Sequence, residues 1–405
     1  MLQTPIGSHK HSGKQQGENL KLQEASIFIK DGVIQEIYSG SQTQQIDIEL
    51  ELDPDTVIDA EGRLVTPGLV DGHTHLVFGG YRQHEIPLKL RGASYLEILQ
   101  TGGGILDTVR ETRKASQNQL IEKSQQFLDE MLAMGVTTCE AKSGYGLNAP
   151  DEIKTLEVIK ELNETHPMDV VATFMGAHAV PPEYKGNADG YMEFLCKELL
   201  PLVKEKNLAD YVDIFCEEGV FDVEESRKYL EAAKNLGFGL KIHTDEIVEL
   251  GGSMLAGQLQ VTSAEHLIAI GEIGLASLLQ GGVIAMVLPG TSFYLDKNFA
   301  PVRKMIEMDI PVAMGSDFNP GSCPSMNLQL IMNLGYLKYK MTPEEILTAV
   351  TVNAACAIGR EAQIGTLEPG KKADLVIWDA PDMEMLCYRF GSNLAIQTIK
   401  EGILV

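Results

Sequence analysis

Short apolar segments recur through the middle of the chain, and each is followed by a longer run with helical spacing. Eight such segments lie at residues 64–70, 136–141, 170–175, 212–216, 239–242, 261–264, 283–288 and 311–314. Runs between them, such as QLIEKSQQFLDEMLAMG and VEESRKYLEAAKNLG, place apolar residues three and four positions apart, as an amphipathic helix does. Strands that alternate with helices form a parallel sheet, so eight units predict an α/β fold with a closed, TIM-like (β/α)8 barrel.

An open, doubly wound sheet is the structural alternative for the same alternation. Residues with polar, reactive side chains fall just after most of the predicted strands. A barrel gathers its active site at that edge of its strands. The pattern therefore favours the barrel.

Both ends of the chain carry a different pattern. In SIFIKDGVIQEIY, Asp31 and Gly32 separate two alternating segments, which predicts a β-hairpin. The segments ADLVIWDAP and IQTIKEGILV are also β-like. We therefore expect a small composite β-sandwich domain from residues 1–63 and 364–405, with the barrel inserted over residues 64–363. We expect the first dozen residues to be disordered.

The charge of the chain excludes several classes of partner. It carries 57 acidic and 33 basic residues, a net charge of −24. A nucleic-acid binder or a peripheral membrane protein needs a basic surface, so we expect neither activity. No apolar run approaches the roughly 18 residues of a membrane span, and the first 20 residues lack the apolar stretch of a signal peptide. The 6 cysteines form no C-x-x-C pair, which argues against a thiolate metal site. A cytoplasmic protein is expected.

A pair of histidines at the end of the first predicted strand suggests a metal site. The segment PGLVDGHTHL places His73 and His75 two positions apart. Strand side chains alternate with period two, so both imidazoles point to one face, and at the mouth of a barrel that face is the interior. Two such imidazoles can share one metal ion. An isolated pair of this kind is more often a surface or hydrogen-bonded pair, but here other candidate ligands follow later strands.

Three further candidates follow the fifth, sixth and eighth predicted strands: His243 in GLKIHTDE, His266 in SAEHL and Asp317 in AMGSDFNPGS. Glu246 lies three residues after His243 and can reach back as a proton-transfer group. Each also has an ordinary interpretation, because Glu246 could sit in the first turn of a helix, His266 in the core and Asp317 at a helix N-cap. Three histidines and one aspartate, with room for water, form the catalytic type of metal site, which activates water for hydrolysis.

These motifs resemble those of the amidohydrolase superfamily, whose signature is the PGLVDGHTHL strand with the later His, His and Asp. Within it, the chain is similar to the imidazolonepropionase family. The narrower similarity is carried by VFGGYRQHE, the stretch around SYLEIL and GGGI, KSGYGL, TFMGAHAVPPEY, GLKIHTDE, LPGTSFYL and SDFNPGS. It runs from about residue 25 to the end of the chain.

The resemblance implies a reaction, a cofactor and a set of site residues. The reaction is hydrolytic opening of the ring of 4-imidazolone-5-propanoate, a small anion, to N-formimidoyl-L-glutamate in histidine degradation. The implied cofactor is one Zn²⁺ or Fe³⁺ ion per subunit, and the family usually forms homodimers. The implied metal ligands are His73, His75, His243 and Asp317, and the implied catalytic residues are Asp317, His266 and Glu246. The implied substrate contacts are Arg82, Tyr95, Tyr145, His178, Glu246, Asn319, Gly321 and Ser322.

The residue types suit these contacts without requiring them. Arg82 lies in a glycine-rich loop and can pair with a carboxylate through two parallel hydrogen bonds, although it could be an exposed loop cation. Tyr145 lies between two glycines that let the backbone approach a ligand, or that simply form a turn. His178 could donate to the substrate or cap a helix. Asn319 and Ser322 could serve only as turn formers in Asn-Pro-Gly-Ser.

Three other functions remain open from the sequence. Deamination of a purine or pyrimidine ring would use the same His, Glu and Asp set. A two-metal cyclic amidase bridged by a carboxylated lysine could use Lys142, but no suitable lysine follows the fourth predicted strand. A binding protein on the same barrel would need no catalytic set.

Overall fold

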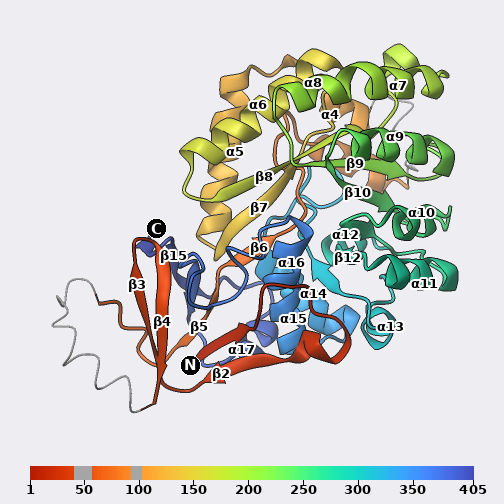
Figure 1. The fold of residues 1–405 in the computed structure, drawn as a ribbon. Helices are drawn as coiled ribbons and strands as arrows, with labels where there is room; N and C mark the ends of the chain where they lie inside the picture. Colours follow the sequence, from red (N-terminus) through yellow and green to blue (C-terminus); the bar gives the residue numbers. More distant parts are fainter. Residues whose placement is uncertain (41–56, 93–102) are drawn as a thin grey trace.

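The computed structural model describes residues 1–40, 57–92 and 103–405, and its central feature is a parallel β-barrel (Figure 1). Its eight strands are neighbours in chain order: β6 (Leu69–Asp71), β7 (Val136–Lys142), β8 (Asp169–Ala177), β9 (Tyr211–Cys216), β10 (Gly239–Thr244), β11 (Ser263–His266), β12 (Ile284–Val287) and β13 (Val312–Met314). Just beyond β6 and β13, Thr74 and Phe318 form a parallel bridge that joins the first strand to the last. The predicted barrel is confirmed, and an open doubly wound sheet is ruled out.

Helices surround the barrel in Figure 1. Those that follow or connect its strands are α2 (Ile86–Leu90), α4 (Ile105–Lys114), α5 (Gln117–Leu132), α6 (Ala149–Thr165), α7 (Ala188–Phe194), α8 (Leu200–Glu205), α9 (Val223–Asn235), α10 (Gly252–Leu259), α11 (Glu272–Gly281), α12 (Pro289–Tyr294), α13 (Val302–Glu307), α14 (Leu328–Tyr339), α15 (Pro343–Ala349) and α16 (Val352–Ala357). A further helix, α17 (Met383–Tyr388), comes near the end of the chain, outside the barrel strands. Shorter helical turns are η1 (Gly13–Gly17), η3 (Gln83–Glu85) and η4 (Pro182–Tyr184), and η5 (Leu195–Leu199) is a π-helical turn between α7 and α8. None of the helices in the described part of the chain is long and apolar enough to cross a membrane.

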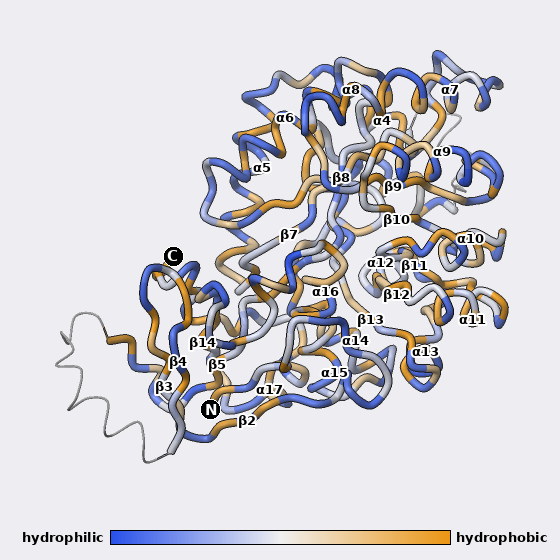
Figure 2. Tube along the Cα trace, viewed as in Figure 1, coloured by the Kyte–Doolittle hydropathy of each residue, from blue (hydrophilic) through white to orange (hydrophobic). Residues whose placement is uncertain are grey.

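The amphipathic runs of the sequence form helices whose apolar faces pack on the barrel. In α5 the buried side chains include Leu120, Leu128 and Met131, and Figure 2 shows hydrophilic and hydrophobic residues alternating along α5 and α6. α5 begins with a capping box, in which the Ser116 hydroxyl accepts the N–H of Gln119 and the Gln119 side chain accepts the N–H of Ser116. Local signals and burial therefore agree on where this helix starts and which face it buries.

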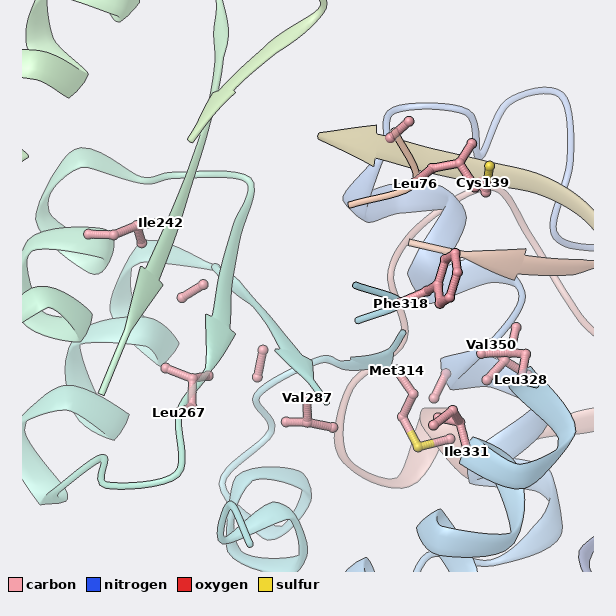
Figure 3. Close-up of a cluster of buried hydrophobic side chains, with 14 of the residues drawn as sticks. Leu76, Cys139, Ile242, Leu267, Val287, Met314, Phe318, Leu328, Ile331 and Val350 are labelled. Atoms are coloured by element: carbon pink, nitrogen blue, oxygen red, sulfur yellow. The ribbon is translucent and has the colours of Figure 1, made fainter. Parts of the chain in front are cut away.

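A hydrophobic layer joins the end of the barrel to the helices that follow it. Met314 on β13 and Leu328 and Ile331 on α14 are fully buried, and Figure 3 shows them close to Phe318 and Val350. Burying a side chain of this size contributes about 1.5–3 kcal/mol. This layer fixes the chain segment between β13 and α14, which carries Asp317.

The two chain ends build a second β unit, as predicted. A six-stranded sheet has the order β16 (Ile403–Leu404), β15 (Ala395–Lys400), β14 (Leu375–Trp378), β5 (Leu64–Pro67), β1 (Leu2–Pro5) and β2 (Asn19–Leu22). The predicted hairpin is β3 (Ala25–Lys30) and β4 (Val33–Ser39), whose turn residues Asp31 and Gly32 have φ angles of 53° and 76°. Apolar residues of the hairpin, including Ile27 and Ile37, pack against a buried cluster that contains Ile377 of the sheet, which gives two β layers.

Two expectations differ from the structure. The predicted strand 64–70 is divided: β5 pairs in the small sheet and β6 in the barrel. Gly68 separates them at a crowded point, where a Cβ atom would lie 2.3 Å from Thr137 Oγ1. The expected disorder of the first dozen residues is wrong, because β1 is buried between β2 and β5, with Leu2 paired to both Leu22 and Val65. The domain ranges themselves stay a prediction.

Candidate active site

Two histidines of the predicted metal site are oriented by buried carboxylates. His73 Nδ1 donates to Glu265 Oε2 at 2.7 Å, and His243 Nδ1 donates to Asp213 Oδ1 at 3.1 Å. The opposite nitrogen of each ring, Nε2, is buried and has no hydrogen-bond partner among the described residues. Histidines that bind metals commonly donate their second N–H to a carboxylate in this way. The ring centroids of His73 and His243 lie 4.7 Å apart, so their Nε2 atoms could bind the same ion.

His75 and Asp317 complete the group. Asp317 Oδ1 lies 3.5 Å from His73 Nε2 and 3.6 Å from His75 Nε2. The backbone of Asp317 is left-handed (φ 53°), and its N–H donates to the carbonyl of His73 at 3.0 Å. The Thr291 hydroxyl donates to the other carboxylate oxygen, Oδ2. Asp317 is therefore not a helix N-cap, a position that Asn327 takes for α14.

The donor atoms of this cluster fit a metal ion. Two groups of three side chains each bring one ligand atom per residue to within 4.8 Å of the others. The first group is His73, His75 and Asp317, and the second is His73, His243 and His266. All five side chains are buried. Buried imidazole nitrogens without partners are costly unless something binds them. Nitrogen and carboxylate donors together suit Zn²⁺ and iron.

His266, one of these five residues, lies beside Glu246. His266 Nε2 is 3.5 Å from Glu246 Oε2. Burial lowers the pKa of His266 to about 3 and raises the pKa of Glu246 to about 7. Burial also raises the pKa of Asp317. The Glu246 carboxyl group can therefore exchange a proton near neutral pH, which is what acid–base catalysis requires.

Tyr145 and His178 form one wall of the site. The His178 ring stacks on His75 with centroids 4.9 Å apart and planes 20° apart, and its Nδ1 donates to the Gly144 carbonyl at 3.2 Å. Tyr145 is buried, with its ring centroid 5.4 Å from His178 and 5.9 Å from His75. Both predicted substrate contacts therefore lie directly beside the metal-ligand candidates.

Arg82 and the loop after β13 lie on another side of the site. The guanidinium of Arg82 lies against Gly321, where a Cβ atom would be 0.9 Å from Arg82 Nη2. The Asn319 side chain is used inside its own turn: Nδ2 donates to Asp317 O at 2.7 Å, and Oδ1 accepts the N–H groups of Gly321 and Ser322 at 2.8 and 2.7 Å. The structure thus gives Asn319 a turn-forming role. Tyr95 lies outside the described residues.

A buried network of charges beneath the site was not predicted. Lys142 Nζ lies 2.7 Å from Asp213 and 2.9 Å from Glu140, and Lys241 Nζ lies 2.9 Å from the other oxygen of Glu140. Burial opposes the charge on Lys142, but Asp213 and Glu140 raise its pKa above the usual value. The network connects β7 to β9 and β10 and ends on Asp213, which orients His243. The alternation of Glu140 and Lys142 within an apolar strand was the available sequence signal.

Comparisons with known proteins identify relatives of the chain. A sequence model of the amidohydrolase family matches residues 64–404. The chain is 51% identical to an imidazolonepropionase of Alkaliphilus oremlandii over 97% of this chain and 93% of that protein. It is 54% identical to an imidazolonepropionase of Fusobacterium nucleatum over 86% of this chain and 84% of that protein.

Solved structures share the fold at low sequence identity. A 5-methylcytosine deaminase from Klebsiella pneumoniae superposes with a TM-score of 0.75 at 18% identity, covering 94% of each chain. The guanine deaminase of E. coli superposes with a TM-score of 0.72 at 16% identity, covering 100% of this chain and 98% of that one. The family model and the two relatives about half identical in sequence show that the chain belongs to the amidohydrolase family and, within it, to the imidazolonepropionases.

Proposed function

We propose that this protein is a hydrolase that opens the ring of 4-imidazolone-5-propanoate to give N-formimidoyl-L-glutamate, a step of histidine degradation. The observation that carries the proposal is the buried cluster of histidines and Asp317, in which the Nε2 atoms of His73 and His243 have no hydrogen-bond partner among the described residues. The chain is also about half identical to imidazolonepropionases over nearly its whole length. The proposed substrate is a small anion, and the Arg82 guanidinium, which lies against Gly321 after β13, supplies a cation for it.

We propose one Zn²⁺ or Fe³⁺ ion per subunit, held by His73, His75, His243 and Asp317. When bound, such an ion acidifies a water molecule and polarises the amide carbonyl. The orientation of His73 by Glu265 and of His243 by Asp213 keeps the Nε2 atoms available for the ion.

Asp317 is placed to move the proton of the reaction. In the proposed step the water oxygen bonds to the ring carbonyl carbon, and Asp317 takes one water proton. The carbon–nitrogen bond of the ring then breaks, and Asp317 returns the proton to the leaving nitrogen. His266, which burial keeps neutral, donates an N–H to the carbonyl oxygen, and Glu246 holds the water or a ring N–H.

The substrate contacts are proposed for the loops around this centre. Arg82 would pair with the propanoate group through its fork of N–H donors. Tyr145 and His178, beside His75, would contact the ring. Tyr95, Gly321 and Ser322 are further contacts carried over from the family, and so is Asn319.

Hydrolysis of freshly generated 4-imidazolone-5-propanoate, followed by loss of the ring absorbance, tests the function. Metal analysis of the same sample measures ions per chain. The competing function is deamination of guanine or cytosine, because deaminases share this fold. Ammonia release from those bases, without turnover of the imidazolone, would favour deamination and overturn the proposal.

We also propose that the protein forms a homodimer and works in the cytoplasm. Light scattering on a size-exclusion column measures the mass of the particle. A mass equal to one chain of 44.3 kDa at working concentration would contradict the dimer.

A further inference from the structure

Two buried carboxylates that no catalytic role requires hold the backbone of two loops at the site. They are Glu217, which follows β9, and Glu152, in the first turn of α6. Glu217 is 1% exposed and Glu152 is fully buried. In each, both carboxylate oxygens accept hydrogen bonds from backbone N–H groups. The two loops carry different parts of the proposed site.

Glu217 holds the segment that carries Glu246. Its Oε2 accepts the N–H groups of Glu246 at 3.1 Å and Ile247 at 2.9 Å, and its Oε1 accepts that of Val248 at 3.2 Å. Oε1 also accepts the N–H of Glu218 at 3.1 Å. The segment 246–248 lies between β10 and α10 and forms no helix or strand. Its backbone donors are therefore satisfied by a side chain from the neighbouring strand end.

Glu152 holds the segment that carries Tyr145. Its Oε1 accepts the N–H groups of Gly146 at 2.7 Å and Leu147 at 2.8 Å, and its Oε2 accepts that of Gly144 at 3.2 Å. Gly144 and Leu147 have left-handed backbones, with φ of 111° and 52°. Glycine adopts such a conformation readily, but leucine rarely does, so the contacts stabilise a disfavoured backbone conformation at Leu147.

We propose that Glu217 and Glu152 are positioning residues with separate effects: Glu217 fixes Glu246 for the chemical step, and Glu152 fixes Tyr145 for substrate binding. The inference rests on the proposed function, because that function assigns Glu246 to chemistry and Tyr145 to binding. Its physical basis is that a buried carboxylate accepts hydrogen bonds at both oxygens, whereas a glutamine amide accepts at only one. A glutamine at either position directs an NH₂ group at backbone N–H donors.

Hydrogen exchange of the metal-loaded enzyme tests the positioning without substrate. In the Glu217→Gln variant, amides 246–248 are expected to exchange at least about 10-fold faster, which corresponds to losing about 1.4 kcal/mol of local protection, while amides 144–147 keep their wild-type rates. The Glu152→Gln variant is the matched control, since it makes the same chemical change in the other loop. In Glu152→Gln, amides 144–147 should exchange faster while amides 246–248 keep their wild-type rates.

Steady-state kinetics on 4-imidazolone-5-propanoate test the division of roles. Glu217→Gln is expected to lower kcat about 10-fold or more with KM within about 3-fold of wild type, and Glu152→Gln to raise KM by about 10-fold with a smaller change in kcat. Glu217→Asp keeps two acceptor oxygens on a side chain one methylene shorter. It should recover part of kcat and part of the protection of amides 246–248.

The outcomes separate this inference from the proposed function. Equal loosening of both loops by each variant, or the same kcat and KM changes in both, would overturn the inference and indicate a general loss of packing. A wild-type enzyme inactive on the imidazolone would overturn the proposed function, while the reciprocal exchange pattern would still report the positioning. If Glu217→Gln does not fold, Glu217→Asp is tested instead, by the same comparison of exchange rates in the two loops and of kcat with KM.

Discussion

The guanidinium of Arg82 occupies the space that a side chain at Gly321 would fill. A Cβ atom at residue 321 would lie 0.9 Å from Arg82 Nη2 and 2.0 Å from Cζ. Glycine at this position therefore allows the cation from the loop after β6 to rest against the loop after β13. Both loops meet at the edge of the barrel where Asp317 lies, which places a positive charge beside the metal-ligand cluster.

Replacing Gly321 with alanine should displace Arg82. The φ angle of Gly321 is not left-handed, so alanine strains only the contact and leaves the fold in place. Losing a charge-assisted pair with the propanoate costs about 1.5–3 kcal/mol, so KM should rise about 10-fold or more with kcat nearly unchanged. Gly17→Ala is the control, because its Cβ atom would meet only Glu345 Cγ at 3.7 Å. An unchanged KM in Gly321→Ala would remove Arg82 from the anchor role.

Asp317→Asn should abolish most of the turnover. Asparagine tolerates the left-handed backbone at this position and keeps the shape of the side chain, but it cannot accept the water proton. A positioned proton acceptor contributes about 10²–10⁴-fold, so kcat should fall by that factor. Asp309→Asn makes the same change at another left-handed, exposed position (φ 61°) and should leave kcat at the wild-type value. Wild-type kcat in Asp317→Asn would refute the assignment.

Glu265→Gln should weaken metal binding. The Glu265 carboxylate accepts the Nδ1–H of His73 and so leaves Nε2 for the proposed ion. Loss of a carboxylate of this kind typically lowers metal affinity about 10–100-fold. Competition with a chelator, measured against wild type and the exposed variant Glu130→Gln, gives the affinity directly. Equal affinities in all three proteins would show that Glu265 does not support the ligand.

Glu246 should make the stability of the metal-free protein depend on pH. Burial raises its pKa to about 7, so the folded state binds the proton more tightly than the unfolded state, whose pKa is near 4.5. The free energy of unfolding therefore falls as pH rises from about 4.5 to about 7, by up to about 3 kcal/mol. Denaturant titrations of wild type and Glu246→Gln across this range isolate the effect, since other groups titrate in both. Parallel curves for the two proteins would contradict the raised pKa.

The contact between Trp378 and Thr66 should stabilise the small sheet. The buried indole Nε1–H of Trp378 donates to Thr66 Oγ1 at 2.9 Å across β14 and β5. Trp378→Phe should lower the free energy of unfolding by about 1–3 kcal/mol. Thr66→Val completes a double-mutant cycle, and a coupling energy of about 0.5–1.5 kcal/mol is expected in urea titrations. Fully additive effects would mean that the hydrogen bond contributes nothing.

The metal-ligand candidates were predictable because their positions repeat a simple relation between strand and chemistry. His73, His243 and Asp317 each follow an apolar segment, and parallel strands bring their carboxyl ends to one edge. The hairpin turn at Asp31 was also predictable, because its signal lies within a few neighbouring residues. A pattern within a few residues sufficed in each case.

The groups that support the site depend on partners far away in the sequence, so no local pattern revealed them. Glu265 meets His73 across 192 positions, and Glu217 holds Glu246 across 29. The expected disorder of the first dozen residues was wrong for the same reason. The strand that begins at Leu2 pairs with Val65, which comes from a distant segment of the chain. Long-range pairing, rather than weak propensity, limited the prediction.

The small sheet has a consequence for the order in which the protein folds during synthesis. β5 pairs with β14, and Thr66 and Trp378 lie 312 positions apart in sequence. The ribosome therefore completes every barrel strand before β5 receives its second neighbour. Contacts of such high sequence separation form late and slow the approach to the native state. Until then this edge of β5 has no partner strand and can pair with other chains, which exposes the nascent protein to aggregation.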